Sequence, residues 1–321
     1  MTPDKRQTPA RIAATAALVT ALLGGCAAPQ LAVSPRPVPR PAAAQPAPAP
    51  VQPSAESQAL AAYYARVQAD LLDQGLLRSD GGGTDTPFTD TMLTENFIRV
   101  ALFDEYRRTG GGLVAQETQS RLRRWEAPVR VSLNFGASVS ADRRATDRAR
   151  ISSYLTRLSQ ITGHPIMLDD RNPNFFVQVV NEDERRALGP VIRATLPELS
   201  SAEVAGLTDL PRSTYCIVYA LSEGSASTYA RAFAVIRAEH PDLLRLSCMH
   251  EEIAQGLGLA NDSPLARPSI FNDDEEFALL TRQDEMMLRI LYDPALHPGM
   301  TATEARPVVR QIAARMLGGA S

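Results

Sequence analysis

The sequence contains very little lysine. Lys5 is the only lysine among 321 residues, so every other strongly basic side chain is an arginine. Acidic residues outnumber the basic ones, and the formal net charge is −3. A chain without a basic excess lacks the electrostatic attraction that drives binding to a phosphate backbone. We therefore expect no nucleic-acid partner, and we interpret the cluster Arg121, Arg123 and Arg124 as a solvated helix face.

The N-terminal apolar run is too short to cross a bilayer. It covers residues 12–23, whereas a membrane-spanning helix needs roughly 20 apolar residues. Three basic side chains precede it, and small residues follow it up to Cys26. This order is typical of a secretory signal, so the sequence predicts a signal peptide over residues 1–25.

The segment Leu23-Gly24-Gly25-Cys26 resembles the bacterial lipobox. The resemblance implies cleavage before Cys26, a lipid on its sulfur, and contact with a membrane through that lipid. An ordinary signal peptide followed by a chance cysteine is the alternative. The residue after Cys26 is Ala27, whereas an aspartate at that position would resemble an inner-membrane retention signal. We therefore expect a lipid-anchored protein of the cell envelope that faces the periplasm, at the outer rather than the inner membrane.

Cysteine is also scarce, with three in the chain. If Cys26 carries the lipid, Cys216 and Cys248 remain, and two cysteines in an oxidising periplasm tend to pair. We expect a disulfide between them, with two buried free thiols as the alternative. Loss of residues 1–25 leaves 30 basic and 35 acidic side chains, so the mature chain stays acidic.

Composition divides the chain into segments. Residues 26–53 hold Cys26 and nine prolines among Ala, Val and Gln, which predicts a disordered, semi-rigid tether. Residues 54–112 form an N-terminal helical section with predicted helices at 54–72, capped by Ser54, and 89–106. Two glycine triplets interrupt this section, and neither is followed by the Lys-Ser or Lys-Thr of a phosphate loop.

We predict an α+β domain over residues 113–303 and a C-terminal helix over residues 304–321. Apolar alternation predicts strands at 129–135, 175–180, 214–221 and 229–236, the last of which could instead be helical. Helical periodicity predicts a long helix at 142–162 and a motif-bearing helix at about 241–259. This order in a mixed sheet is the order seen in zincin catalytic domains, which gives a zincin-like domain as the expected fold.

The segment CMHEEIAQGLGLAND, residues 248–262, begins in the motif-bearing helix and continues past its predicted end. It resembles the zinc-protease pattern H-E-x-x-H-x-x-G-x-x-H in the frame that starts at Glu251. In that frame Glu252 stands at the general-base position, while Glu251, Gln255 and Asn261 stand where the three metal-binding histidines would be. The scaffold is retained, but none of the three ligand positions is a histidine.

The donors in this frame are carboxylate and amide oxygens. Such oxygens favour Ca²⁺ or Mg²⁺ over zinc, which prefers imidazole nitrogen and thiolate. We therefore expect no cofactor, with an oxygen-ligated divalent metal as the alternative. Asp262 is a further candidate for lining the site, because an acid–base pair with a glutamate of the helix would need a partner outside it. A solvated helix face is the structural alternative for Glu251 and Glu252.

A second frame, which starts at His250, does not supply the second metal ligand of the pattern. Its second ligand position is Ala254, which has no donor atom. His250 would then be a single histidine that points about 100° away from Glu251 around the helix. A lone histidine of this kind is more often structural than a metal ligand.

The chain resembles the bacterial domain-of-unknown-function family 2927, found in exported proteins of Alphaproteobacteria. The supporting residues are Cys248, Glu251-Glu252, Gln255, Leu257-Gly258-Leu259, Asn261-Asp262, Ser269-Ile270-Phe271-Asn272-Asp273, Leu291-Tyr292-Asp293-Pro294 and Pro298-Gly299-Met300. The resemblance covers about residues 120–300 and implies no biochemical activity. The segment 269–272 is also similar to the methionine turn beneath the metal of metzincins, with Phe271 in place of the methionine.

Two functions follow from these patterns, and the sequence leaves enzyme and non-enzyme undecided. The first is a degenerate zincin-like domain that acts as a binding or scaffolding module for an envelope protein or peptidoglycan. The second is an active hydrolase, either a peptidase or a peptidoglycan-directed enzyme, with Glu252 as general base.

Overall fold

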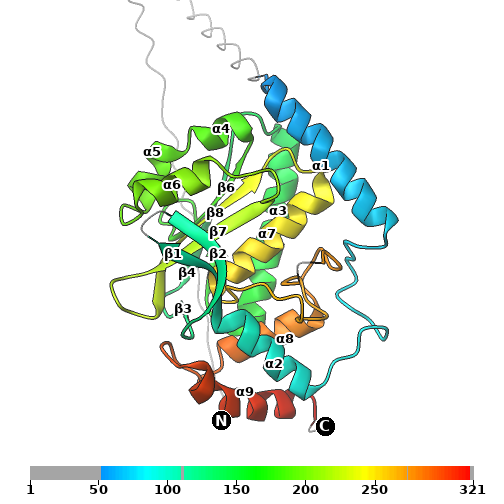
Figure 1. The fold of residues 1–321 in the computed structure, drawn as a ribbon, viewed down its shortest axis with the longest axis vertical. Helices are drawn as coiled ribbons and strands as arrows, with labels where there is room; N and C mark the ends of the chain where they lie inside the picture. Colours follow the sequence, from blue (N-terminus) through cyan, green and yellow to red (C-terminus); the bar gives the residue numbers. More distant parts are fainter. Residues whose placement is uncertain (1–51, 110–111, 273, 319–321) are drawn as a thin grey trace, which may run out of the picture. The chain divides into compact units, whose positions relative to one another are not determined.

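The structure, a computed structural model, describes residues 52–109, 112–272 and 274–318 (Figure 1). The predicted signal peptide, Cys26 and the tether up to residue 51 lie outside these residues. The described residues belong to one compact unit that starts at Ala49. Within them, no helix combines the length and the apolar character needed to cross a membrane.

The centre of the unit is a mixed β-sheet. Its strands are β3 (Arg124–Trp125), β4 (Val129–Phe135), β5 (Ile166–Leu168), β6 (Phe175–Val180), β7 (Cys216–Ser222) and β8 (Thr228–Arg237). Strand β4 pairs in parallel with β5 and β6, β6 pairs in parallel with β8, and β7 is antiparallel to β8. Strand β3 adds a short parallel pairing at the start of β8. This sheet with helices around it agrees with the expected α+β class.

Helices cover both faces of the sheet (Figure 1). The helices on one face include α3 (Ala141–Thr162), α7 (Asp242–Leu257) and α8 (Arg282–Leu291); those on the other are α4 (Glu182–Arg186), α5 (Gly189–Thr195) and α6 (Ser201–Thr208). Val177 and Val179 of β6 enter the larger core with α3, α7 and α8, whereas Phe233 and Val235 of β8 enter the smaller core. Alternate residues of a strand point to opposite faces, so β6, β7 and β8 contribute to both cores.

The predicted strands and long helices agree with these elements. Residues 129–135 and 175–180 coincide with β4 and β6, and 229–236 lies within β8 and is a strand, not a helix. Helix α3 begins after the cap Ser140 and ends at Gly163, whose φ of 67° only glycine adopts readily. Three short helices between β6 and β7 had no predicted counterpart.

The N-terminal part differs more from the prediction. It comprises α1 (Ala55–Asp73), α2 (Asp90–Ala101) and a hairpin of β1 (Phe103–Thr109) and β2 (Gly112–Gln119). Ser54 caps α1 as predicted, but α2 ends at Ala101, and the predicted continuation to residue 106 is the first strand of the hairpin. The expected domain boundary at residues 112 and 113 therefore falls at the start of β2. Helix α2 packs against α8 and the C-terminal helix α9 (Ala302–Met316), which joins it to the sheet domain.

Candidate functional site

Two glycines let α7 lie close to the sheet. A Cβ atom on Gly256 would stand 2.4 Å from the Phe175 ring, and one on Gly258 would stand 2.3 Å from the backbone oxygen of Arg123. Gly258 ends α7 with a φ of 128°, which disfavours other residues. Trp125 Nε1 donates a 2.8 Å hydrogen bond to the oxygen of Gly256. The motif helix and the segment that leads into β3 are thus held in direct contact.

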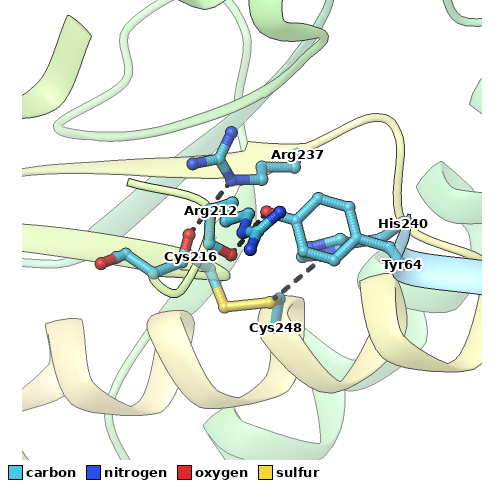
Figure 2. The surroundings of a disulfide bond; sticks show 7 residues. Tyr64, Arg212, Cys216, Arg237, His240 and Cys248 are labelled. Carbon is cyan, nitrogen blue, oxygen red and sulfur yellow. Dashed lines mark hydrogen bonds between the residues drawn. A yellow bond between two sulfur atoms is a disulfide. The ribbon is translucent and has the colours of Figure 1, made fainter. Parts of the chain in front are cut away.

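A disulfide ties the same helix to the edge strand. Cys216 at the start of β7 is bonded to Cys248 in α7, which confirms the predicted pairing (Figure 2). His240 Nδ1 lies 3.7 Å from Cys248 Sγ, and burial holds the pKa of His240 well below its ordinary value. Tyr64 of α1 covers His240, with ring centroids 4.4 Å apart. Helix α1 therefore covers the buried side of the cross-link.

A pocket with a volume of about 470 Å³ lies between β7 and α7. Its walls include all seven residues of β7 and four polar residues in and after α7: Glu251, Glu252, Gln255 and Asp262. Glu252 is the deeper of the two glutamates, with 3% of its surface exposed, and Glu251 is partly exposed. Gln255 Nε2 donates to Asp262 Oδ1 at 2.9 Å, so these two side chains form one polar wall.

Asn261 lies outside this pocket. Its side-chain Nδ2 donates to the oxygen of Arg99 at 2.9 Å, and its backbone nitrogen donates to the oxygen of Val100 at 3.0 Å. The side chain is 1% exposed and stabilises the C-terminal turn of α2. Of the three positions that replace the zinc ligands, the structure brings Glu251 and Gln255 together in the pocket and places Asn261 at α2.

His250 points into the core between α7 and α3. Its ring stacks on Tyr154 with centroids 3.8 Å apart and an interplanar angle of 11°, and the Tyr154 hydroxyl donates to the His250 oxygen at 2.8 Å. Burial lowers the pKa of His250 to about 3. The histidine is neutral at ordinary pH and has a packing role, as expected for a lone histidine.

The segment after the helix is also structural. Ser269 Oγ donates to Asp284 Oδ1 at 2.5 Å and accepts from the Phe271 nitrogen at 3.0 Å, and Phe271 is fully buried. Burial raises the pKa of Asp284 to about 6, although the hydrogen bonds from Ser269, Ile270 and Thr281 favour its ionised form. None of these side chains lines the pocket between β7 and α7. The segment 269–272, which resembles a methionine turn in sequence, therefore supports the core beneath α8.

Sequence reasoning missed part of the lining. Asp104 at the start of β1 and Arg123 just before β3 form an ion pair there, and the Arg123 guanidinium lies 5.8 Å from the Tyr229 ring centroid. Arg123 belongs to the arginine cluster interpreted as a helix face, but the described segment around it is not helical. Residues this far apart in the sequence share no local pattern. Arg123 reaches the site because its backbone lies close to Gly258 at the end of α7.

The donors present do not fit a metal ion. Across residues 52–109, 112–272 and 274–318, no group of three or more His, Cys, Asp or Glu side chains is placed to hold one. Gln255 also directs its amide nitrogen, not its oxygen, at Asp262. A stable Ca²⁺ site would need six to eight oxygen ligands. We therefore derive no step through a metal.

Comparison with protein families gives one result. The model of a family described as "Protein of unknown function (DUF2927)" matches residues 90–311, from the start of α2 into α9. Comparison with curated proteins gives no match, and comparison with solved structures gives none either.

Proposed function

We propose a function on the premise that the chain belongs to the DUF2927 family, whose model matches more than two thirds of its length. The protein is a cell-envelope lipoprotein whose folded unit is a binding or scaffolding module. The pocket between β7 and α7 is its binding site, and an envelope protein or peptidoglycan is its partner. The single observation that carries this proposal is the convergence of Glu251, Glu252, Gln255 and Asp262 on that pocket.

The proposed fold relationship is a zincin-like domain without its metal. It is supported by the sheet, in which β7 is the antiparallel edge strand, and by α7, which follows β8 and runs beneath β7. It is also supported by Gly258, which ends the helix where the zinc-protease pattern has its glycine. The three ligand positions hold oxygen donors, and one of them, Asn261, binds the end of α2 instead. A scaffold of this kind can bind a ligand without hydrolysing it.

The second candidate function is a hydrolase. One observation favours it: Glu252, at the general-base position, lies in the pocket wall and is almost fully buried. A buried carboxylate beside a bound ligand could accept a proton from an attacking water. Among the described lining residues, Arg123 is the one side chain with a positive charge that could stabilise an oxyanion, and it is paired with Asp104. We therefore rank binding above hydrolysis.

One experiment separates the two functions. The purified full chain, prepared without chelator, is assayed for metal content and for hydrolysis of peptides and muropeptides, beside Glu252→Gln and the exposed control Glu198→Gln. The binding module predicts less than stoichiometric metal and no turnover in any of the three. Stoichiometric metal together with turnover that Glu252→Gln abolishes and Glu198→Gln retains would show an enzyme instead. Binding of peptide or muropeptide by calorimetry completes the comparison.

The membrane anchor is a separate part of the proposal. It is supported by the Leu-Gly-Gly-Cys segment and by the proline-rich tether that follows it. Cys26→Ser should move the protein from the outer-membrane fraction to the soluble periplasmic fraction without altering the folded unit. A Cys26→Ser protein that stays in the membrane fraction would contradict a lipid on this cysteine.

A further inference from the structure

Two arginines stand in one row across three parallel strands of the sheet. The nitrogen of Asn174, just before β6, donates to the oxygen of Arg130 in β4 at 2.9 Å. The oxygen of Asn174 accepts from the backbone nitrogen that follows Arg231 in β8, also at 2.9 Å. Neighbouring strands lie about 5 Å apart, so the Cα atoms of the two arginines are separated by about 10 Å.

Both arginine side chains lie on the face of the sheet that carries the smaller core. Val129 and Val131, which flank Arg130, enter the larger core, so Arg130 points to the opposite face. Arg231 lies two residues before Phe233, which enters the smaller core, and it shares the face of Phe233. The two guanidinium groups therefore project from the same side of the sheet.

A cavity of about 730 Å³ lies at this part of the sheet, and both arginines line it. Phe176 of β6 is a further lining residue, and its half-buried ring packs against the smaller core. The lining has two residues in common with the pocket between β7 and α7, namely Ala226 and Tyr229. The chain thus has a second concave site, with charged groups and an aromatic ring in its walls.

Main-chain oxygens hold both guanidinium groups in place. Arg130 donates through Nε to the oxygen of Asn172 and through Nη1 to the oxygen of Pro128. Arg231 Nη1 donates to the oxygen of Thr195, at the end of α5, at 3.1 Å. A guanidinium has five N–H donors, so each keeps donors beyond these bonds. Among the described residues, neither arginine forms an ion pair with a carboxylate.

The cavity is basic although the chain is acidic. Its described lining contains the two guanidinium groups and one carboxylate, that of the exposed Glu223 between β7 and β8. The whole chain has a formal net charge of −3, so the positive charge here is local. Binding to a polynucleotide needs many phosphate contacts. Two arginines in a cavity fit one small anion instead.

We propose that this cavity binds a phosphoryl group between Arg130 and Arg231, in a ligand whose ring packs on Phe176. The inference goes beyond the proposed function, because it concerns a different cavity and stands without it. A phosphate monoester carries nearly two negative charges at neutral pH and has three acceptor oxygens, which suit two guanidinium groups. A carboxylate carries one charge, and a single bidentate arginine satisfies it.

Phenyl phosphate is the probe for this site. It is titrated into the full chain at pH 7 and moderate salt, and its ring protons are followed by ligand-observed NMR. We expect it to bind at least tenfold more tightly than phenyl sulfate, which has the same ring and one negative charge. It should also bind more tightly than methyl phosphate, which lacks the ring. No binding at millimolar phenyl phosphate, or equal affinity for the phosphate and the sulfate, would overturn the proposal.

The pH dependence gives a second comparison that leaves the protein unchanged. The second proton of a phosphate monoester has a pKa of about 6, whereas an arginine side chain keeps its charge in this range. The affinity for phenyl phosphate should therefore rise severalfold between pH 5 and pH 7. Phenyl sulfate has the same charge at both pH values and should bind equally at both. Parallel pH profiles for the two probes would contradict recognition of a dianion.

Protein variants assign the binding to this cavity. Arg130→Gln and Arg231→Gln should each weaken binding of phenyl phosphate at least tenfold, since charge-assisted hydrogen bonds are lost. The exposed control Arg310→Gln in α9, with the same change of charge, should leave the affinity unchanged. Because Arg231 is exposed, its substitution tests the site even if Arg130→Gln lowers stability. Full affinity in Arg231→Gln would overturn the assignment.

A soluble phosphate ester and a lipid headgroup present the same chemistry, and vesicles separate these two sources. The full-length Cys26→Ser chain is sedimented with phosphatidylcholine vesicles that contain or lack phosphatidic acid. Cosedimentation that requires phosphatidic acid and is lost in the added variant Arg231→Gln identifies a lipid headgroup. Binding of phenyl phosphate without cosedimentation identifies a soluble ester. Cosedimentation that Arg231→Gln retains, with no binding of phenyl phosphate, would place the anion elsewhere and overturn the proposal.

Discussion

At the scale of single residues, Gly256 determines how closely the motif helix approaches the sheet. A methyl group there would overlap the Phe175 ring, so Gly256→Ala should reduce the free energy of unfolding by about 1–3 kcal/mol. The matched control is Gly206→Ala in α6, where the nearest atom would be 3.8 Å from the new Cβ. That change should be neutral or stabilising by up to about 1 kcal/mol. Denaturant unfolding followed by circular dichroism measures both, and equal effects would contradict the close packing.

His250 makes a pH-dependent contribution at the same scale. Because burial lowers its pKa from 6.5 to about 3, the unfolded chain takes up a proton at pH values where the folded chain does not. The stability that depends on neutral His250 is therefore fully present above pH 6.5 and is lost as the pH falls towards 3. At pH 5 this loss is about 2 kcal/mol.

His250→Phe tests this contribution, because phenylalanine keeps a ring against Tyr154 and cannot titrate. The variant should lose less stability than the unmodified chain between pH 7 and pH 5, with a difference of about 2 kcal/mol. Buried His240 should leave a residual dependence of the same sign. The exposed His297→Phe serves as the control and should follow the unmodified chain. Parallel pH profiles for His250→Phe and the unmodified chain would contradict the burial of a neutral imidazole.

At the scale of elements, the disulfide connects the two walls of the pocket. Its residues are 32 apart in the sequence, and a loop of that length corresponds to about 3–4 kcal/mol of stabilisation through the unfolded state. The double variant Cys216→Ser with Cys248→Ser should lose stability by that amount. It should also bind pocket ligands more weakly, because β7 and α7 lose their covalent link. Unchanged stability in denaturant unfolding, with a thiol count that shows the unmodified chain oxidised, would contradict this role.

The individual helices and strands also differ in how well they could be predicted from the sequence. Strand β4 shows apolar alternation and β6 is a short, mostly apolar run, while α3 and α7 are long enough for periodicity to reveal them. Strand β1 is mostly polar after Phe103, and among the described strands it pairs with β2 alone, so its pattern did not separate it from the end of α2. Helices α4 and α6 begin with capping boxes, but they are too short to give a periodic signal.

The site residues could likewise be predicted where they share one long element, and not where they come from distant segments. Glu251, Glu252 and Gln255 share one helix, so their common position could be read from their spacing. Asn261 follows Gly258, where the chain leaves the helix, and local spacing no longer determines its direction. Asp104 and Arg123 reach the pocket through the packing of distant segments, which a single sequence does not specify.

At the scale of the whole molecule, α1 is part of the folded unit and not of the tether. Ser57 Oγ donates to Glu239 Oε1 at 2.7 Å, Tyr64 donates to the oxygen of Arg212 at 2.9 Å, and Gln68 accepts from the Leu244 nitrogen at 3.0 Å. These contacts lie along three turns of the helix. The tether predicted from composition should therefore end at about residue 53.

Limited proteolysis checks this boundary. A nonspecific protease should first cleave within residues 27–53 and leave a resistant core that starts close to Ser54, because backbone fixed in a helix is a poor protease substrate. Mass spectrometry identifies the first stable fragment. Tyr64→Ala, which removes the contact with Arg212 and His240, should make the segment between α1 and α2 susceptible as well. Cleavage between Asp73 and Asp90 of the unmodified chain at the same rate as the tether would show that α1 is not docked.

The hydrogen bond from Trp125 to Gly256 has a spectroscopic consequence. Trp125 is the single tryptophan of the chain, it is 1% exposed, and its indole contacts the backbone of α7 four residues after Glu252. The tryptophan emission of the protein therefore comes from one chromophore, which is hydrogen-bonded to the helix that carries Glu251 and Glu252. Any displacement of that helix, whether by an occupant or by reduction of the cross-link, changes the environment of the indole and can be followed optically without a label.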